Sequence, residues 1–214
     1  GKDAAYENFP VGSWLLPADL RPHIATFYRF ARAIDDIADS PDLKPHEKIA
    51  RLDGFAVALK DGGDANDGFE TGLSMRTSLQ ETDISSRHCL DLIDAFKQDA
   101  VKNRYDDWKD LMGYCIRSAS PVGRYLIDLH GGSNNGYGPS DALCNALQVI
   151  NHLQDCKDDY LKLDRVYLPG DWMGEEGMCV TALAEDHSSP QVRRVINRTL
   201  SATEDLMIEA WKLP

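Results

Sequence analysis

Two pairs of aspartates, far apart in the chain, have the types and spacing of metal ligands. Asp35 and Asp39 lie four residues apart, and Asp155 and Asp159 repeat that spacing. A helix turns about 100° per residue, so a step of four places both carboxylates of a pair on one face. Such carboxylates repel each other, and oxygen ligands at this spacing suit a hard ion such as Mg²⁺. One pair alone is typical of a solvated helix end, whereas two pairs predict a shared metal site.

Metal ions held between two such pairs suit the departure of diphosphate from an allylic carbon. The ions would neutralise the charge that develops on the leaving group, and a carbocation would remain in an apolar pocket. Phe27 and Phe30 are candidates for the wall of this pocket. The sequence therefore has to provide helices that bring the two pairs to one cavity.

The first pair lies near the end of a predicted helix. Apolar residues recur there at steps of three and four (Ile24, Phe27, Ala31, Ile34 and Ala38). We expect this helix to begin after a cap at Asp19 and to end near Ser40. Tyr28 and Arg32 share the face of the aspartate pair, whereas Asp36 points toward solvent.

The second pair lies on a predicted helix over residues 141–162, with Ser140 as its cap. Apolar residues spread over more than half of its circumference, which predicts a central, mostly buried helix. One narrow strip of it is polar (Gln148, Asn151, Asp155 and Asp159). A polar strip on a buried helix needs a polar cavity to face. The long connection that follows, residues 163–189, is predicted to be a functional flap.

The remaining chain also favours helices. Further helices are predicted over residues 46–60, 69–81, 85–104 and 106–129, and a last one opens at Ser189-Pro190. Pro121 should interrupt the fourth of these, at a cluster of small residues (Ser118, Ala119, Ser120 and Gly123). The cluster indicates either close helix packing or the approach of a ligand. No β-alternation of note appears, so the predicted class is all-α, with one domain over residues 1–214.

The amino-acid composition limits which binding partners and which cellular compartment we expect. The formal charge of −12 argues against nucleic acid and against simple docking on anionic lipid. The 5 cysteines are odd in number and widely spaced, which indicates free thiols in a reducing compartment. No apolar run has the length of a membrane span and no signal peptide is visible. We expect a cytoplasmic protein, with peripheral membrane association left open.

The two aspartate motifs resemble those of the squalene/phytoene synthase family. Tyr28, Arg32, Asp35, Asp36 and Asp39 are similar to its first motif. Residues 147–159, followed by residues 164–169, are similar to its second. Residues 94–105 and 114–123 resemble the segments between. The similarity runs in order from about residue 8 to residue 169, and it is the combination that is specific.

The resemblance implies an isoprenoid synthase-type helical bundle around a central cavity, and it implies roles for single residues. Metal ligands for Mg²⁺ would be Asp35, Asp39, Asn151, Asp155 and Asp159. Contacts with a prenyl diphosphate substrate would come from Asn8, Tyr28, Arg32, Gln148, Asn151, Arg165 and Tyr167. Tyr114 would join the four aspartates as a catalytic residue. Gln154 departs from the family pattern, because family members often carry Arg there, and family chains continue with further helices beyond the point that matches Pro214.

The opening segment, residues 7–17, is most similar to bacterial hydroxysqualene synthases of the hopanoid pathway. Those enzymes convert presqualene diphosphate to hydroxysqualene by ionisation, rearrangement and capture of the cation by water, without reduction. The alternative within the family is the condensation of two farnesyl diphosphates to presqualene diphosphate or squalene, or a phytoene-type synthesis. A non-catalytic prenyl-binding or assembly protein is the alternative from a different class. The oligomeric state stays open.

Overall fold

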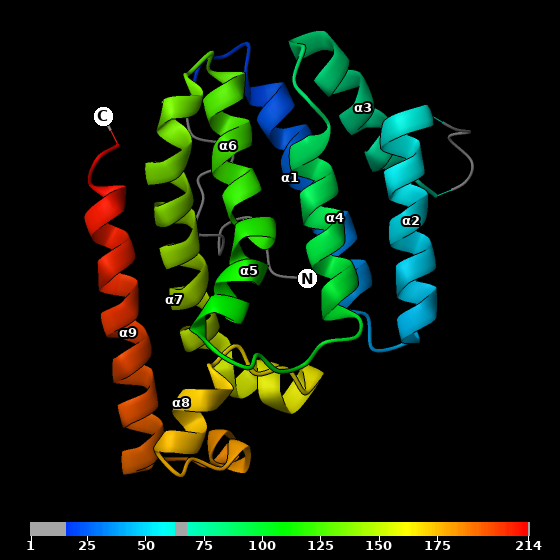
Figure 1. Ribbon diagram of the computed structural model, residues 1–214. Coiled ribbons are helices and arrows are strands. Elements are labelled where there is room, and N and C mark those ends of the chain that lie inside the picture. The colour runs from blue at the N-terminus through cyan, green and yellow to red at the C-terminus, as the bar shows by residue number, and fades with distance from the viewer. Residues whose placement is uncertain (1–15, 63–67, 214) are drawn as a thin grey trace. The chain divides into compact units, whose positions relative to one another are not determined.

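The computed structural model describes residues 16–62 and 68–213. These residues form helices joined by loops (Figure 1). The elements, in chain order, are α1 (Arg21–Asp39), α2 (Pro45–Asp61), α3 (Glu70–Thr82), α4 (Arg87–Asp99), α5 (Trp108–Ser118), α6 (Ser120–Leu129), η3 (Asn134–Gly136), α7 (Tyr137–Leu163), α8 (Gly170–Glu175), η4 (Val180–Ala184) and α9 (Pro190–Ala210). Within the described ranges, the only β-type pairing is an isolated bridge between Tyr105 and Pro169. The all-α prediction is confirmed.

The chain forms two compact units, which we describe separately. Unit 1 comprises Gly1–Ala100 and Tyr125–Gly132, and unit 2 comprises Val101–Arg124 and Ser133–Pro214. Helices α1 to α4 therefore belong to unit 1, together with the C-terminal half of α6. Helices α5 and α7 to α9 belong to unit 2. The single domain expected from the sequence stays a prediction.

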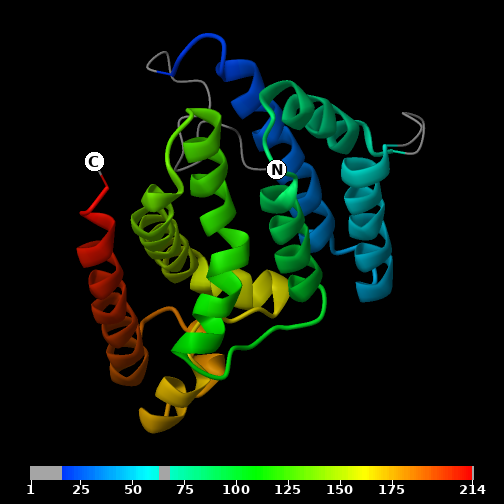
Figure 2. The same ribbon diagram turned by 45° about the horizontal axis from the view of Figure 1, so that its top comes forward.

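Unit 1 is built around α1, which contacts α2, α3 and α4 (Figure 2). The buried face of α1 carries Ile24, Phe27, Phe30, Ile34 and Ala38. Phe30 is fully buried and meets the ring of Phe55 on α2 at 6.1 Å between ring centroids, edge to face. Phe27 stacks on Tyr125 of α6, with centroids 4.1 Å apart. Phe30, a candidate for the pocket wall, is thus a core residue of unit 1.

The start of α1 differs from the prediction. Its N-cap is Leu20, which makes no side-chain cap hydrogen bond, so the expected cap at Asp19 is wrong. Pro22 lies in the first turn, where a missing amide hydrogen costs nothing because that donor has no helical partner. Arg21 Nε instead donates to the carbonyl of Leu16, at 2.9 Å, and so ties the preceding turn to the helix.

Unit 2 is built around α7 and α9, which lie side by side and run in opposite directions (Figure 1). Ser189 caps α9 by accepting a hydrogen bond from the amide of Val192, as expected for a Ser-Pro helix start. Helix α7 begins at Tyr137 rather than near residue 141. Pro139 is tolerated there because the first turn of a helix needs no internal donors. Ser140 is consequently buried inside the helix and is not its cap.

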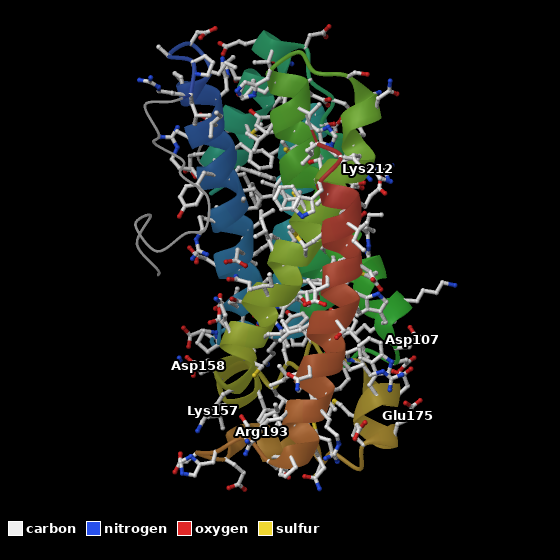
Figure 3. The ribbon with its side chains drawn as sticks, turned by 90° about the vertical axis from the view of Figure 1, so that its left-hand side faces the viewer. Asp107, Lys157, Asp158, Glu175, Arg193 and Lys212 are labelled. Carbon is white, nitrogen blue, oxygen red and sulfur yellow. The ribbon has the colours of Figure 1, made fainter. Side chains whose placement is uncertain are left out.

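The connection after α7 is packed rather than open as a flap. Its apolar residues form one core cluster with the start of α9 (Val166, Leu168, Met173, Met178, Leu183, Val192 and Val195). Short helix α8 lies against α9, where Arg198 pairs with Glu175 and its guanidinium lies 4.5 Å from the ring of Trp172. Figure 3 shows Glu175 on α8, beside the N-terminal part of α9. Burial of these apolar side chains explains why the segment folds onto the core.

Candidate active site

The first aspartate motif lies on α1 in unit 1, and an arginine links its carboxylates. Arg32 Nη1 donates to Asp35 Oδ2 at 2.6 Å, and Arg32 Nη2 donates to Asp36 Oδ1 at 3.0 Å. The Asp35 side chain is 29% exposed, whereas that of Asp36 is 66% exposed. Asp36 therefore points further toward solvent, as the helical spacing predicts. Tyr28 and Asp39 are half-buried on the same helix.

The surroundings of the Asp35 carboxyl disfavour its charged form. Burial, followed by the negative charge of Asp39, raises the pKa of Asp35 from 3.8 to about 7, although Arg32 acts in the opposite direction. Asp36 and Asp99 raise this pKa further. A bound cation would relieve this repulsion, so the pair has the electrostatic character of a cation site.

Asp99 was not among the predicted site residues. It is the last residue of α4 and is 4% exposed. Its charge acts on Asp35 from a second helix of unit 1. A buried acid is unusual enough to mark a site, but the sequence alone does not show that Asp99 faces inward, since Asp94 on the same helix is an exposed partner of Lys97.

The second aspartate motif lies on α7 in unit 2. Gln148, Asn151, Asp155 and Asp159 are all half-buried. The helix is less buried than its apolar content predicts, because its buried residues are only Ser140, Ala142, Asn145, Ala146 and Val149. Leu147 is 45% exposed and Leu161 is 56% exposed. The expectation of a mostly buried helix is wrong, since most of its residues are only half-buried and Leu147 and Leu161 are exposed.

Three tyrosines and a histidine of unit 2 form a cluster of rings, which we call the tyrosine cluster (Tyr105, Tyr114, His152 and Tyr167). Tyr114 and Tyr167 lie 5.4 Å apart between ring centroids, and Tyr105 lies 5.5 Å from each of them. His152 stacks on Tyr167 at 3.7 Å, with ring planes inclined by 11°. The structure thus brings together two predicted site residues, Tyr114 and Tyr167, with two that sequence reasoning missed.

His152 joins this cluster to the polar strip of α7. Its Nε2 lies 3.2 Å from Nε2 of Gln148, one helical turn earlier. Burial, and then the positive charge of Arg165, lower the pKa of His152 from 6.5 to about 3, so its ring is neutral at neutral pH. Arg165 itself is buried. The spacing from Gln148 to His152 to Asp155 follows one helix face, and this was the signal that could have identified His152.

Paired backbone segments hold Tyr167 in place. Helix α7 ends at Leu163, and its C-cap Asp164 adopts a left-handed conformation with φ of 51° and pairs with the guanidinium of Arg104. The amide of Val166 then donates to the carbonyl of Asn103 at 3.0 Å, and that of Gly170 to the carbonyl of Tyr105 at 2.9 Å. Residues 103–106 and 164–171 therefore run as a short paired stretch that sets two tyrosines beside each other.

The small residues at the break between α5 and α6 serve helix packing. A Cβ on Gly123 would lie 2.3 Å from Ser140 Oγ and 2.7 Å from Cys144 Sγ, so only glycine allows this contact with α7. Ser120 Oγ donates to Asn145 Oδ1 of α7 at 3.0 Å. Of the two interpretations of these small residues, close helix packing is correct at Gly123 and Ser120. The break itself falls at Ala119, two residues before Pro121.

The remaining predicted residues have the following status. Asn8 lies outside the described residues. Tyr28, Arg32, Asp35 and Asp39 lie in unit 1, and the other predicted residues lie in unit 2. Among residues 16–62 and 68–213, no three or more His, Cys, Asp or Glu side chains are grouped so as to hold a metal ion. The convergence of the two aspartate pairs on one cavity thus stays a prediction. All five cysteines are free thiols, as expected.

Comparison with known proteins identifies the class. The sequence model of the squalene/phytoene synthase family matches residues 3–214. The hydroxysqualene synthase of Sinorhizobium fredii is 41% identical over 202 residues, which cover 94% of this chain and 68% of that protein. The hydroxysqualene synthase of Rhodopseudomonas palustris is 41% identical over 207 residues, covering 97% of this chain and 70% of that one.

A solved structure supports the same assignment. The crystal structure of squalene synthase HpnC from Alicyclobacillus acidocaldarius superposes with a TM-score of 0.82 at 31% sequence identity, covering 98% of this chain and 79% of that one. This chain belongs to the squalene/phytoene synthase family and is an enzyme of that class. A non-catalytic prenyl-binding protein is correspondingly disfavoured. None of the helices in the described part of the chain is long and apolar enough to cross a membrane.

Proposed function

We propose that this enzyme converts presqualene diphosphate to hydroxysqualene, by loss of diphosphate, rearrangement of the carbocation and its capture by water. The observation that carries the proposal is the similarity to hydroxysqualene synthases along almost the whole chain. Retention of all four motif aspartates supports it, because an enzyme that releases diphosphate needs cations to balance the leaving charge. The product would belong to hopanoid biosynthesis.

Mg²⁺ is the cofactor that this reaction implies. Asp35, Asp39, Asn151, Asp155 and Asp159 would hold it, and the raised pKa of Asp35 supports a cation site at the first pair. Carboxylate and amide oxygens are the donors that Mg²⁺ prefers. When bound, the metal ions would neutralise the charge on the departing diphosphate.

The other residues of the two motifs would bind and orient the substrate. The guanidinium groups of Arg32 and Arg165 suit diphosphate oxygens, and Tyr28 and Gln148 add hydroxyl and amide contacts. The rings of Tyr114 and Tyr167 belong to the tyrosine cluster, and ring faces stabilise a nearby cation. Neutral His152 is suited to such a neighbourhood, because it adds no positive charge to repel the cation.

The alternative is an earlier reaction of the same class, the condensation of two farnesyl diphosphates to presqualene diphosphate or squalene. The observation that favours it is that the similar solved structure is that of a protein named squalene synthase. A phytoene-type synthesis is a weaker form of the same alternative. All of these need the same metal ions and a long apolar pocket, so the product has to be measured.

The test is to supply each diphosphate separately with Mg²⁺ in ¹⁸O-labelled water, with and without NADPH, and to identify the extracted products. We expect labelled hydroxysqualene from presqualene diphosphate, at a rate that NADPH does not change. Squalene that forms only with NADPH and carries no label would reject the proposal. Presqualene diphosphate formed from farnesyl diphosphate would instead support the alternative.

The apolar product also suggests where the enzyme would act. A triterpene alcohol partitions into lipid, so we propose peripheral association with a membrane at which the product is delivered. Co-sedimentation with vesicles, with and without product, would test this. A protein that stays in the supernatant under both conditions would contradict it.

A further inference from the structure

Ser118 carries a buried hydroxyl group that has no hydrogen-bond partner among the described residues. It is the last residue of α5 and is 8% exposed. Its Oγ is buried and has no hydrogen-bond partner within residues 16–62 and 68–213. Buried hydroxyl groups are normally paired, so one that is left unpaired calls for an explanation, such as a bound water or a catalytic role.

The nearby Ser120 shows that the helix break does not by itself leave a serine unpaired. Its Oγ, fully buried, donates to Asn145 Oδ1 at 3.0 Å. Both serines lie in unit 2, two residues apart, and the same break separates them. Ser120 therefore serves packing against α7, whereas Ser118 has an unused hydrogen-bonding group.

Ser118 also shares a helix face with Tyr114, a residue of the proposed site. It follows Tyr114 by one turn of α5, and residues four apart share a helix face. The ring of Tyr114 lies 5.4 Å from that of Tyr167 and 6.0 Å from that of His152. Ser118 therefore carries a hydroxyl group on the face of α5 that also carries Tyr114.

We propose that Ser118 holds the water molecule that captures the carbocation. This inference rests on the proposed function. The carbon–oxygen bond to diphosphate breaks and its electron pair leaves with diphosphate. After rearrangement, the water oxygen forms a new bond to the cationic carbon, and the released proton passes to the departed diphosphate. Ser118 Oγ accepts a hydrogen bond from that water and leaves a lone pair of the water directed at the cation.

Ser118 is a positioning residue in this account, because it acts through the water. Without a held water, the cation loses a proton and becomes a hydrocarbon. The hydroxyl group turns about a single bond, so it reaches a bound water without a change in the backbone. The ratio of alcohol to hydrocarbon therefore reports on Ser118, whereas the rate of diphosphate release reports on the metal and substrate contacts.

The experiment compares Ser118→Ala, Ser118→Thr and Ser120→Ala with the wild type, on presqualene diphosphate with Mg²⁺. Products are separated, diphosphate release is measured, and melting temperatures are recorded. Ser118→Ala should lower the ratio of alcohol to hydrocarbon about tenfold, the equivalent of one lost hydrogen bond, with little change in diphosphate release. Ser118→Thr keeps the hydroxyl group and should keep the ratio.

The matched control separates this role from a structural one. Ser120→Ala breaks a satisfied buried hydrogen bond, so it should lower the melting temperature and leave the product ratio unchanged. Ser118→Ala removes an unpaired polar atom and should not lower the melting temperature. An unchanged ratio in Ser118→Ala, with wild-type alcohol formed, overturns this inference alone. A wild type that releases diphosphate without forming alcohol overturns the proposed function and this inference with it.

Discussion

The imidazole of His152 and the phenol of Tyr167 lie face to face, 3.7 Å apart between centroids and inclined by only 11°. His152 belongs to α7, whereas Tyr167 follows the end of that helix. The stack therefore fixes how the chain leaves α7 and presents Tyr167. Because His152 also contacts Gln148, one side chain links a ring and an amide that both belong to the proposed substrate site.

Two substitutions of His152 should distinguish the effect of its stack on Tyr167 from the effect of its contact with Gln148. His152→Phe keeps a ring against Tyr167 but loses the contact with Gln148, so we expect a melting temperature near that of the wild type and kcat lowered about tenfold. His152→Ala also loses the stack and should cost about 2–4 kcal/mol of unfolding free energy. Gln154→Ala, at an exposed position of the same helix, is the control. Equal stability losses in the Phe and Ala variants would contradict the stacking role.

The stability of unit 2 should depend on pH through His152. Its pKa falls from 6.5 in an unfolded chain to about 3 in the folded protein, so the unfolded state binds more protons between these values. The stability gained from a neutral ring is fully present above pH 6.5 and is lost as pH falls toward 3. His152→Phe should therefore melt progressively above the wild type as pH is lowered from 7 to 4. A pH-independent difference would argue against burial of the neutral ring.

Asp35 should make the stability of the metal-free protein depend on pH in the opposite direction. Its folded pKa is raised from 3.8 to about 7, so the folded state binds more protons between these values and stability falls as pH rises through them. Asp35→Asn removes this charge, and its melting temperature should exceed that of the wild type increasingly from pH 4 to pH 8. Addition of Mg²⁺ should narrow the gap at pH 8 by stabilising only the wild type. A gap that is the same at both ends of the range would refute the raised pKa.

Loss of one aspartate from either motif should prevent turnover. Asp35→Ala and Asp155→Ala should each reduce the rate at least about 1000-fold, because charge stabilisation at the leaving group is lost. Mg²⁺ with a diphosphate analogue should raise the melting temperature of the wild type and not of these variants. Asp158→Ala is the control, since Asp158 is exposed on α7 and pairs with Lys162 at 2.8 Å. Equal shifts in all four proteins would exclude the metal assignment.

Gly123 should be essential for the contact between α6 and α7. Gly123→Ala places a Cβ within 2.7 Å of both Ser140 Oγ and Cys144 Sγ, and such overpacking typically costs about 1–3 kcal/mol. Gly113→Ala on α5 meets no atom within 4 Å and should stabilise the protein by about 1 kcal/mol. Urea unfolding of the two variants would measure both effects. A neutral Gly123→Ala would contradict the close packing of α6 against α7 at this position.

Periodicity predicted the helices well because it reports directly on burial. The stripe from Ile24 to Ala38 identified α1, although Phe30, not Ala31, is the residue buried in its middle. Helix starts were less predictable. Asp19 and Ser140 are good capping residues by type, but Pro22 and Pro139 fit within a first turn, and the helices begin elsewhere. Propensity at a helix end is worth about 1 kcal/mol and is easily outweighed by packing.

The site was predictable where spacing within one helix determined it. Gln148, Asn151, Asp155 and Asp159 share one face of α7 by arithmetic alone. Asp99 and His152 were missed because their roles depend on tertiary contacts, with Asp35 on another helix and with Tyr167 beyond the helix end. From the sequence alone, one cannot tell whether such a His stacks on another ring, binds a ligand or is only buried in the core.

Unit 1 is built from two separate segments of the chain, and this affects how it can fold during translation. Its first hundred residues are completed by Tyr125–Gly132, which emerge from the ribosome only after the first part of unit 2. Tyr125, on which Phe27 stacks, is synthesised well after Phe27. Asp128, whose Oδ2 lies 2.7 Å from Nε2 of His88, is likewise synthesised after His88. Domains usually fold in order as they are synthesised. Unit 1 cannot be completed in this order, because a nascent chain that ends between residues 100 and 125 can pack α1 against α2, α3 and α4 but lacks the ring that covers Phe27.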